Sequence, residues 1–282
     1  MNSVELSAGV IEYEDRGGPG AALVFLHGLL MDETLWTAVA DDLAPGHRCV
    51  IPVLPLGAHR KGMSPQADLS PHGIAGLVRE FLDALDLRDV TLVGNDTGGA
   101  LVQLLMADGA LERVSGVVLV SCDAFDNFPP GLTGRTLFLT GKLSPALFGL
   151  FMQQMRLKLV RRLPIAFGWL TKRGDAVVKP WMRPIWRQRE IRRDTVRVLR
   201  SAAADRKLLT TAAEKLARFD RPALVVWAAQ DRVMPPEHGR RLADLLPDAR
   251  LVEIEDSYTL LPLDQPARLA TEIRRFLGED EA

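Results

Sequence analysis

A short apolar strand runs into a turn of small residues around Asp96 and then into a helix. Residues 90–93 are apolar and strand-like, and residues 100–106 follow a helical pattern. The small residues Gly94 and Gly98 permit so sharp a turn that the side chain at its apex stands out in a strained conformation. This strand–turn–helix run is the nucleophile-elbow arrangement, with a carboxylate at the apex. It predicts an α/β fold and a reactive Asp96.

The rest of the chain alternates strands with helices. A hairpin is predicted over residues 4–15, and a helix is predicted to begin at Ser70, which precedes Pro71. Further strands are predicted at residues 22–25, 49–54, 114–120, 223–228 and 249–254. Nearly continuous apolar strands separated by helices indicate a mostly parallel, doubly wound sheet that is covered on both faces.

The strand signal disappears in the middle of the chain. Residues 125–216 have helix-like segments interrupted by prolines, so they are predicted to form a helical cap inserted between two strands. The core is then expected to comprise residues 1–124 and 217–282. Such a cap would cover the carboxyl ends of the strands, where open α/β sheets bind their ligands.

Composition limits the class of protein. The chain is 47% hydrophobic and 25% charged with a formal net charge of −1, which is typical of a globular domain and gives no general attraction to nucleic acid. Cys49 and Cys122 adjoin apolar runs, which indicates reduced, buried thiols. We find no signal-peptide pattern and no apolar run that could span a bilayer. These features predict a soluble, cytoplasmic protein without an integral membrane segment.

Residues 156–200 contain fourteen Lys or Arg but three Asp or Glu. This basic stretch has two interpretations: a solvated helix face, or a positive rim that attracts an anionic substrate or anionic lipid. Trp169, Trp181 and Trp186 lie in the same stretch, where tryptophans either pack or contact a ligand.

Four motifs together resemble those of α/β-hydrolase-fold proteins, in the branch that includes haloalkane dehalogenases and epoxide hydrolases. They are residues 27–30, the elbow around Asp96, the strand and acid at residues 225–231, and residues 256–266. The resemblance covers nearly the whole chain. It implies hydrolysis in which a carboxylate attacks carbon and forms an ester that water then cleaves.

The resemblance also implies a role for individual residues. Asp96 would be the nucleophile, and backbone N–H groups of Leu29 and Thr97 would form the oxyanion hole. Asp231 would be the acid member that orients a histidine. Asp123 is a second candidate for that acid, although a turn or cap role is the favoured interpretation.

The usual histidine is replaced by Thr259, whose hydroxyl cannot act as a base near neutral pH. His59 follows a core strand, so it is the candidate for a relocated base; the alternative is a loop histidine bonded to backbone. The predicted substrate-binding residues are Trp36, Asn95, Trp181, Tyr258 and Thr259.

The substrate is expected to be a small to medium, largely apolar molecule. Thr97 stands where dehalogenases usually have a halide-binding tryptophan, and neither tyrosine lies in the cap, where epoxide hydrolases have theirs. No zinc-site spacing or phosphate-binding loop is present, so we expect no metal or nucleotide cofactor and no nucleic-acid partner. The alternative to a hydrolase is a ligand-binding protein or lyase-like enzyme that has lost hydrolysis.

Overall fold

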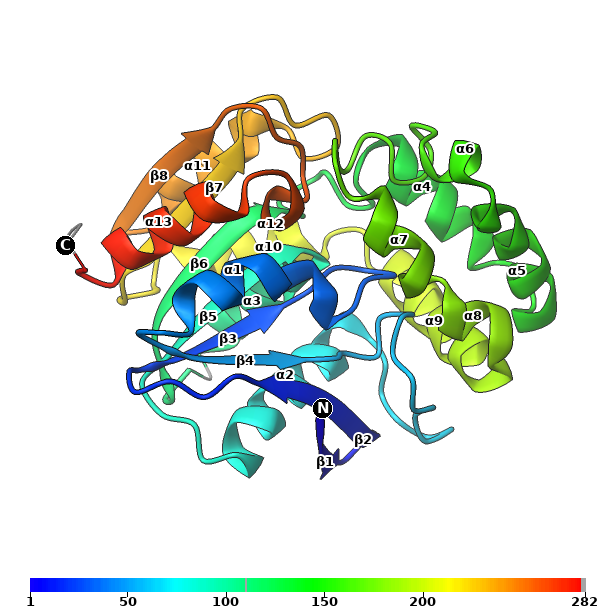
Figure 1. The fold of residues 1–282 in the computed structure, drawn as a ribbon, viewed down its shortest axis with the longest axis horizontal. Helices are drawn as coiled ribbons and strands as arrows, with labels where there is room; N and C mark the ends of the chain where they lie inside the picture. Colours follow the sequence, from blue (N-terminus) through cyan, green and yellow to red (C-terminus); the bar gives the residue numbers. More distant parts are fainter. Residues whose placement is uncertain (110, 280–282) are drawn as a thin grey trace.

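The computed structural model describes residues 1–109 and 111–279, and a single eight-stranded sheet lies at its centre (Figure 1). Along the sheet the strands follow the order β1-β2-β4-β3-β5-β6-β7-β8. The strands are β1 (Asn2–Leu6), β2 (Gly9–Asp15), β3 (Ala22–Leu26), β4 (Arg48–Pro52), β5 (Val90–Asp96), β6 (Val114–Cys122), β7 (Ala223–Ala228) and β8 (Ala249–Ile254). The pairs β1/β2 and β2/β4 are antiparallel, and all the others are parallel. The predicted α/β class with a mostly parallel sheet is confirmed.

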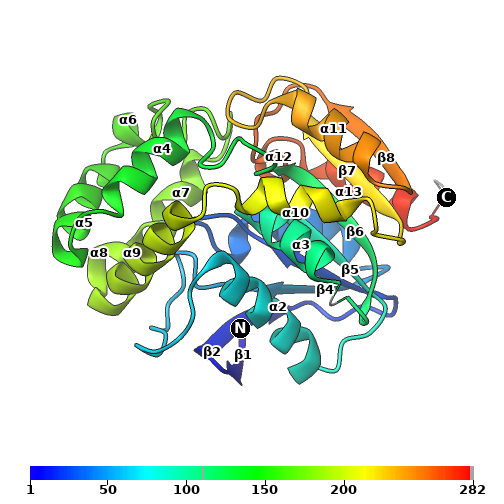
Figure 2. The same ribbon diagram turned by 180° about the vertical axis from the view of Figure 1, so that it is seen from behind.

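Helices cover both faces of the sheet. Figure 1 shows α1 (Thr37–Leu43) and α13 (Pro266–Phe276) on one face. Figure 2 shows the helices of the other face, which are α2 (Pro71–Ala84), α3 (Thr97–Asp108), α10 (Leu208–Leu216) and α11 (Pro236–Leu245). Every residue of β5 is buried, as expected of a central strand between two helical layers.

The predicted start of α2 is correct in detail. Ser70 is the N-cap of this helix, and its hydroxyl accepts a 3.0 Å hydrogen bond from the N–H of Gly73. Pro71 occupies the first helical position, where the missing N–H costs nothing. The buried residues of α2 face the sheet at helical spacing.

A group of helices between β6 and β7 lies over one end of the sheet (Figure 1). We call this group the cap. Its helices are α4 (Gly131–Thr140), α5 (Pro145–Met152), α6 (Lys158–Arg161), α7 (Asp175–Trp181), α8 (Arg183–Arg187) and α9 (Arg189–Ala204), with a 3-10 turn, η2 (Gln153–Arg156). The predicted cap range of 125–216 also includes α10, which packs against α3 on the sheet. We use the name cap for α4 to α9 with η2 and leave α10 outside it.

Two short elements complete the fold. A 3-10 turn, η1 (Glu33–Trp36), precedes α1, and α12 (Leu261–Asp264) precedes α13. Among the described residues, no helix combines the length and the apolar character needed to cross a membrane.

Candidate active site

Asp96 is the last residue of β5 and the N-cap of α3. Its backbone angles are φ 55° and ψ −127°, a conformation that a residue with a side chain adopts only under strain. The turn is tight because Gly98 follows: a Cβ atom on Gly98 would lie 2.2 Å from the carbonyl oxygen of Leu26. The predicted nucleophile elbow is thus present, with the Asp96 carboxylate at its apex.

One oxygen of this carboxylate, Oδ1, accepts three hydrogen bonds. The N–H of Thr97 donates at 2.6 Å, the N–H of Leu29 at 3.3 Å, and the hydroxyl of Thr97 at 3.0 Å. The two backbone donors are those predicted for the oxyanion hole. Because both already point at Oδ1 of Asp96, this oxygen is where negative charge is best stabilised.

His27 supports the loop that presents Leu29. Its Nε2 accepts the N–H of Leu54 at 3.0 Å, and its Nδ1 lies 2.9 Å from the carbonyl oxygen of Gly28. Burial lowers the pKa of His27 to about 4. The ring is therefore neutral at physiological pH and acts as a structural link between the ends of β3 and β4.

Asp123 lies beside Asp96. The strands β5 and β6 are parallel, and a register shift at their ends pairs Asp96 with Cys122, so the next residue, Asp123, emerges at the same edge. The hydroxyl oxygen of Thr97 is 3.3 Å from Oδ2 of Asp123 and 3.0 Å from Oδ1 of Asp96. Both carboxyl groups are buried.

Burial raises the pKa of both acids. For Asp123 the pKa rises well above its usual value, because the negative charge of Asp96 adds to burial. For Asp96 the rise caused by burial is opposed by the hydrogen bonds from Thr97 and Leu29. A threonine hydroxyl has one proton to donate. The hydroxyl therefore donates to Oδ1 of Asp96 or to Oδ2 of Asp123 but not to both at once, and Oδ1 of Asp123 is a buried atom without a hydrogen-bond partner.

An apolar cavity of about 120 Å³ begins at these two carboxyl groups and extends under the cap. Asp96, Thr97 and Asp123 are among its lining residues, and most of the others are apolar. From the core come Leu29, Leu30, Met31, Leu56, Pro71, Ile74, Ala100, Leu101, Leu104, Leu208 and Val233. The cap contributes side chains of α4, α5 and α9 and of residues 160–170. Such a cavity accommodates an apolar chain whose reactive end lies at the carboxylates.

Asp231 and Thr259 lie together behind this cavity. Asp231 follows β7, and its Oδ1 accepts the hydroxyl of Thr259 at 2.8 Å and the N–H groups of Val233 and Met234, both at 2.9 Å. Burial raises the pKa of Asp231 to about 6, and its other oxygen, Oδ2, is a buried atom without a hydrogen-bond partner. Thr259 thus stands where the resemblance places a histidine, and its hydroxyl points at the predicted acid.

The structure places His59 away from Asp96. Its Nδ1 accepts the N–H of Gly57 at 3.2 Å, and its Nε2 lies 3.6 Å from Oδ2 of Asp194, a buried residue of α9. Asp194 Oδ2 also accepts the N–H of Met63 at 2.8 Å. His59 is buried and does not line the cavity. Its contacts fit a role in joining the cap to the core.

Three of the predicted substrate-binding residues contact other parts of the protein. Trp36 is buried against Phe25, with 5.1 Å between ring centroids. Trp181 of α7 is buried and donates its indole N–H to the hydroxyl of Thr34 at 2.7 Å. Asn95 donates to backbone carbonyl oxygens, including that of Thr259 at 2.8 Å, so it fixes the loop after β8 next to the elbow.

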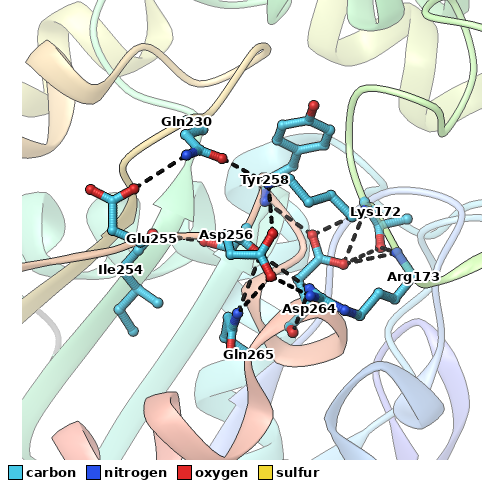
Figure 3. Close-up of polar contacts among 11 residues, drawn as sticks. Lys172, Arg173, Gln230, Ile254, Glu255, Asp256, Tyr258, Asp264 and Gln265 are labelled. Carbon is cyan, nitrogen blue, oxygen red and sulfur yellow. Dashed lines mark hydrogen bonds and ion pairs between the residues drawn. The ribbon is translucent and has the colours of Figure 1, made fainter.

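Tyr258 belongs to a polar network that holds the same loop against the cap (Figure 3). The carboxylate of Asp264 accepts the N–H groups of Tyr258, Lys172 and Arg173. The Tyr258 ring has the Lys172 ammonium 5.0 Å from its centroid and lines a different, more polar cavity. These contacts position the loop that carries Thr259.

The basic stretch is largely engaged with the protein. Arg161 pairs with Asp175 at 3.1 Å, and Arg200 donates to the carbonyl oxygens of Gly141 and Leu143. Arg192 donates to the carbonyl oxygen of Ile185 at 2.9 Å. Within the described residues, no group of three or more metal-binding side chains is placed to hold a metal ion.

Asp123, for which a turn or cap role is the favoured prediction, has its carboxyl group next to that of Asp96. The signal that could have found this residue is its place directly after β6, the strand next to the elbow strand. Carboxyl ends of neighbouring parallel strands share one edge of a sheet, so residues that follow them meet.

Comparisons with known proteins identify the fold family of the chain. The family model described as "alpha/beta hydrolase fold" matches residues 21–266. An uncharacterised hydrolase of Bacillus subtilis is 24% identical over 285 residues, which cover 95% of this chain and 94% of that protein. A haloalkane dehalogenase of Mesorhizobium japonicum is 34% identical over 110 residues, covering 39% of this chain and 35% of that one.

Solved structures are similar over the whole length. A putative ancestral haloalkane dehalogenase has a TM-score of 0.78 at 20% identity, with 99% of each chain covered. An esterase from Thermogutta terrifontis has a TM-score of 0.73 at 19% identity, also with 99% of each chain covered. At these identities the likeness concerns the fold.

Proposed function

Because the chain belongs to the α/β-hydrolase-fold family, we propose that it is a hydrolase that opens an apolar epoxide through an ester on Asp96. The observation that carries the proposal is the pair of buried acids at the end of the cavity, of which one accepts both oxyanion-hole donors. Thr97 lies between them, with its hydroxyl oxygen 3.0 Å from Asp96 and 3.3 Å from Asp123.

In the first step Oδ2 of Asp96 attacks a ring carbon of the epoxide. The carbon–oxygen bond breaks, and the ring oxygen takes the proton of neutral Asp123. The products are a hydroxyalkyl ester of Asp96 and an ionised Asp123. The raised pKa of Asp123, caused by burial and by the charge of Asp96, keeps that proton available near neutral pH.

In the second step water cleaves the ester. Asp123 removes a proton from water, and the hydroxide adds to the carboxyl carbon of Asp96. The negative charge forms on Oδ1, between the N–H groups of Leu29 and Thr97. When the carbonyl reforms, the alcohol oxygen leaves with the proton from Asp123. The carboxyl proton left on Asp96 then returns to Asp123, so one shared proton serves both steps.

This arrangement favours an epoxide over an alkyl halide. A halide leaves as an anion and is stabilised by N–H donors or by a cation, and among the described residues that line the cavity there is no Trp, Lys or Arg. An epoxide oxygen, in contrast, is protonated as it leaves and requires only the acid that Asp123 provides.

Asp231 and Thr259 have a supporting part in this proposal. Asp123 takes over the proton transfer that a histidine performs in the proteins that the chain resembles. The bond from Thr259 to Asp231 then holds the loop after β8 in place, next to the elbow.

The test is intact-protein mass spectrometry after exposure to a 1,2-epoxide with an alkyl chain of six to ten carbons, compared with the matching 1-bromoalkane. We expect a mass increase equal to that of the epoxide, located on the peptide that contains Asp96 and missing in Asp96→Asn. Asp123→Asn should slow both formation and cleavage of this adduct. Single turnover in ¹⁸O-labelled water should put the label into the carboxyl group of Asp96. Diol formation without label in Asp96 would contradict the ester mechanism.

A second candidate function is ligand binding without turnover. It is favoured by Thr259, because a threonine supplies no imidazole at this position. The Thr259 side chain is buried and donates its hydroxyl to Asp231. In that case the epoxide forms no adduct and no diol, while apolar ligands still raise the melting temperature of the protein.

A further inference from the structure

Exposed apolar side chains of the described residues are concentrated on the cap. Ten large hydrophobic residues are exposed, and nine of them lie between residues 132 and 165. We call these nine the cap apolar face: Leu132, Leu139, Leu147, Leu150, Phe151, Leu157, Leu159, Leu163 and Ile165. Leu150 is 70% exposed and Leu159 is 80% exposed. Exposed apolar side chains gathered in one part of a protein mark an interaction site.

The face has helical order. In α5, Leu147, Leu150 and Phe151 are exposed at i, i+3 and i+4, while Phe148 and Met152 are buried. The helix α5 packs against α8 and α9 through its buried side. Its outward side, with the three exposed residues, is apolar as well. A helix that is apolar on both sides is typical of contact with an apolar environment in place of water.

Charge on the same segment is of one sign. Residues 127–174 contain eight Lys or Arg and no Asp or Glu. Five of these basic residues are exposed and lie in the same stretch of chain as the cap apolar face: Arg135, Lys142, Arg156, Lys158 and Arg162. Exposed apolar side chains interspersed along the chain with cations complement a bilayer that carries anionic lipid. A second copy of the chain fits less well, because two such faces would bring like charges together.

The cavity opens on this face. Phe151, Gln154 and Ile165 line the cavity that ends at Asp96, and all three are exposed. The path to the carboxylates therefore starts among the residues that face outward. Figure 1 shows α4, α5 and α6 at the outer end of the cap, remote from the strands β1 and β8 at the sheet edges.

From these observations we propose that the cap apolar face docks on a bilayer containing anionic lipid, with the mouth of the cavity against the lipid. The leucines enter the region between headgroups and acyl chains, and the surrounding cations contact the lipid phosphates. An apolar substrate then passes from the bilayer into the cavity without crossing water. The docking stands independently of the reaction, whereas the delivery of substrate rests on the proposed function.

The experiment is cosedimentation of the full chain with vesicles of phosphatidylcholine, with or without one third phosphatidylglycerol, at 0.1 M and 0.5 M NaCl. We expect the protein to sediment with the anionic vesicles. Its binding to vesicles of phosphatidylcholine alone should be at least tenfold weaker. Raising the salt should weaken binding to the anionic vesicles, since the electrostatic part is screened. Protein that stays in the supernatant with both kinds of vesicle would overturn the proposal.

Two double variants separate the contributions. Leu150→Ser with Leu159→Ser should weaken binding at least tenfold and leave the melting temperature within a few degrees, because both side chains are exposed. Arg135→Glu with Lys142→Glu should weaken binding to anionic vesicles to a similar extent. The matched control is Arg88→Glu with Arg218→Glu, which makes the same charge change at exposed sites that precede β5 and β7. An equal loss in the control would overturn the assignment to the cap.

Two further results have defined meanings. Sedimentation equilibrium without vesicles should show a monomer. A dimer that is lost in the Leu150→Ser and Leu159→Ser double variant would mean that a second copy of the chain covers the cap apolar face. That result would also overturn the proposal. Asp96→Asn should bind vesicles as the unaltered protein does. Vesicle binding without any Asp96 adduct would leave the docking in place and contradict the proposed reaction alone.

Discussion

Thr259 donates its hydroxyl to Asp231 across 2.8 Å, and the two residues lie in the loops that follow the parallel strands β8 and β7. The pair has the positions of an acid and its histidine in the proteins that this chain resembles, with the imidazole missing. The acid has kept a buried oxygen, Oδ2, that has no hydrogen-bond partner.

Thr259→His should therefore supply a base. An imidazole beside Asp231 gains a proton more readily than one in an apolar site, because the carboxylate stabilises the imidazolium. We expect the ester on Asp96 to be cleaved at least tenfold faster, measured as decay of the adduct in the mass spectrum. The larger side chain should destabilise the buried site by about 1–3 kcal/mol. Thr259→Val is the control, and it should not accelerate the decay; acceleration in both variants would contradict the role of the imidazole.

Asp231 should make stability depend on pH. Burial raises its pKa to about 6 in the folded protein, while an unfolded aspartate has a pKa of about 3.9. Between these values the folded state keeps a proton that the unfolded state has lost, so the free energy of unfolding falls as pH rises from 4 to 6. Asp231→Asn removes this effect. The free energy of unfolding is measured with urea at pH 4, 5, 6 and 7 for both proteins. From pH 4 to pH 7, the value for the variant should increase by about 2–3 kcal/mol relative to that of the unaltered protein. Parallel stability curves would contradict the raised pKa.

Gly28 leaves room for the carboxylate of Asp96. A Cβ atom at this position would lie 2.3 Å from Oδ1 of Asp96. Gly28→Ala should displace that oxygen from the N–H of Leu29 and reduce ester formation by at least tenfold, measured as the rate of adduct appearance. Gly76→Ala is the matched control: it lies within α2 with no heavy atom within 4 Å of the new methyl group. It should leave the rate unchanged and stabilise the helix by about 1 kcal/mol.

Asp194 joins α9 of the cap to the loop that follows β4. The N–H of Met63 donates to it at 2.8 Å and Arg193 donates to it at 2.9 Å, and Nε2 of His59 lies 3.6 Å away. Burial opposes its ionisation, yet the nearby His59 ring and the hydrogen bonds from Met63 and Arg193 lower its pKa. Asp194→Asn removes the charge that these groups share and should cost about 3 kcal/mol of unfolding free energy.

Hydrogen exchange should locate this effect. In Asp194→Asn the amides of residues 57–67 and of α9 should exchange faster, because the loop and the helix lose their shared partner. Asp205→Asn, at the exposed C-terminal end of the same helix, is the control and should leave these rates unchanged. Unaltered exchange at Met63 in Asp194→Asn would contradict the role of the carboxylate.

The fold was predictable because its signals are local. The elbow around Asp96, the apolar strands and the Ser70 cap each depend on residues close in the sequence. Their periodicity is imposed by burial on both faces of a parallel sheet. The predicted bounds of β7 and β8 coincide with the observed strands for the same reason.

The polar residues around the elbow were less predictable, because their side-chain directions are set by partners far along the chain. His59 turns toward Asp194 on α9, and Asn95 turns toward the carbonyl oxygen of Thr259. The proximity of Asp123 to Asp96 depends on the register between β5 and β6. None of these relationships has a period or spacing that a single sequence displays.

The attachment of the cap restricts the shape of the molecules that reach Asp96. Arg197 of α9 donates to the carbonyl oxygens of Ser64 and Ala67, and Asp264 accepts the N–H groups of Lys172 and Arg173. A cap fixed to the core at these two places does not open as one rigid lid without breaking polar contacts, among them the buried bond between Asp194 and the N–H of Met63. Entry then depends on small rotations of side chains at the mouth. Slender, linear molecules would thread through such an opening, while branched or polycyclic molecules of equal polarity would be rejected by width alone.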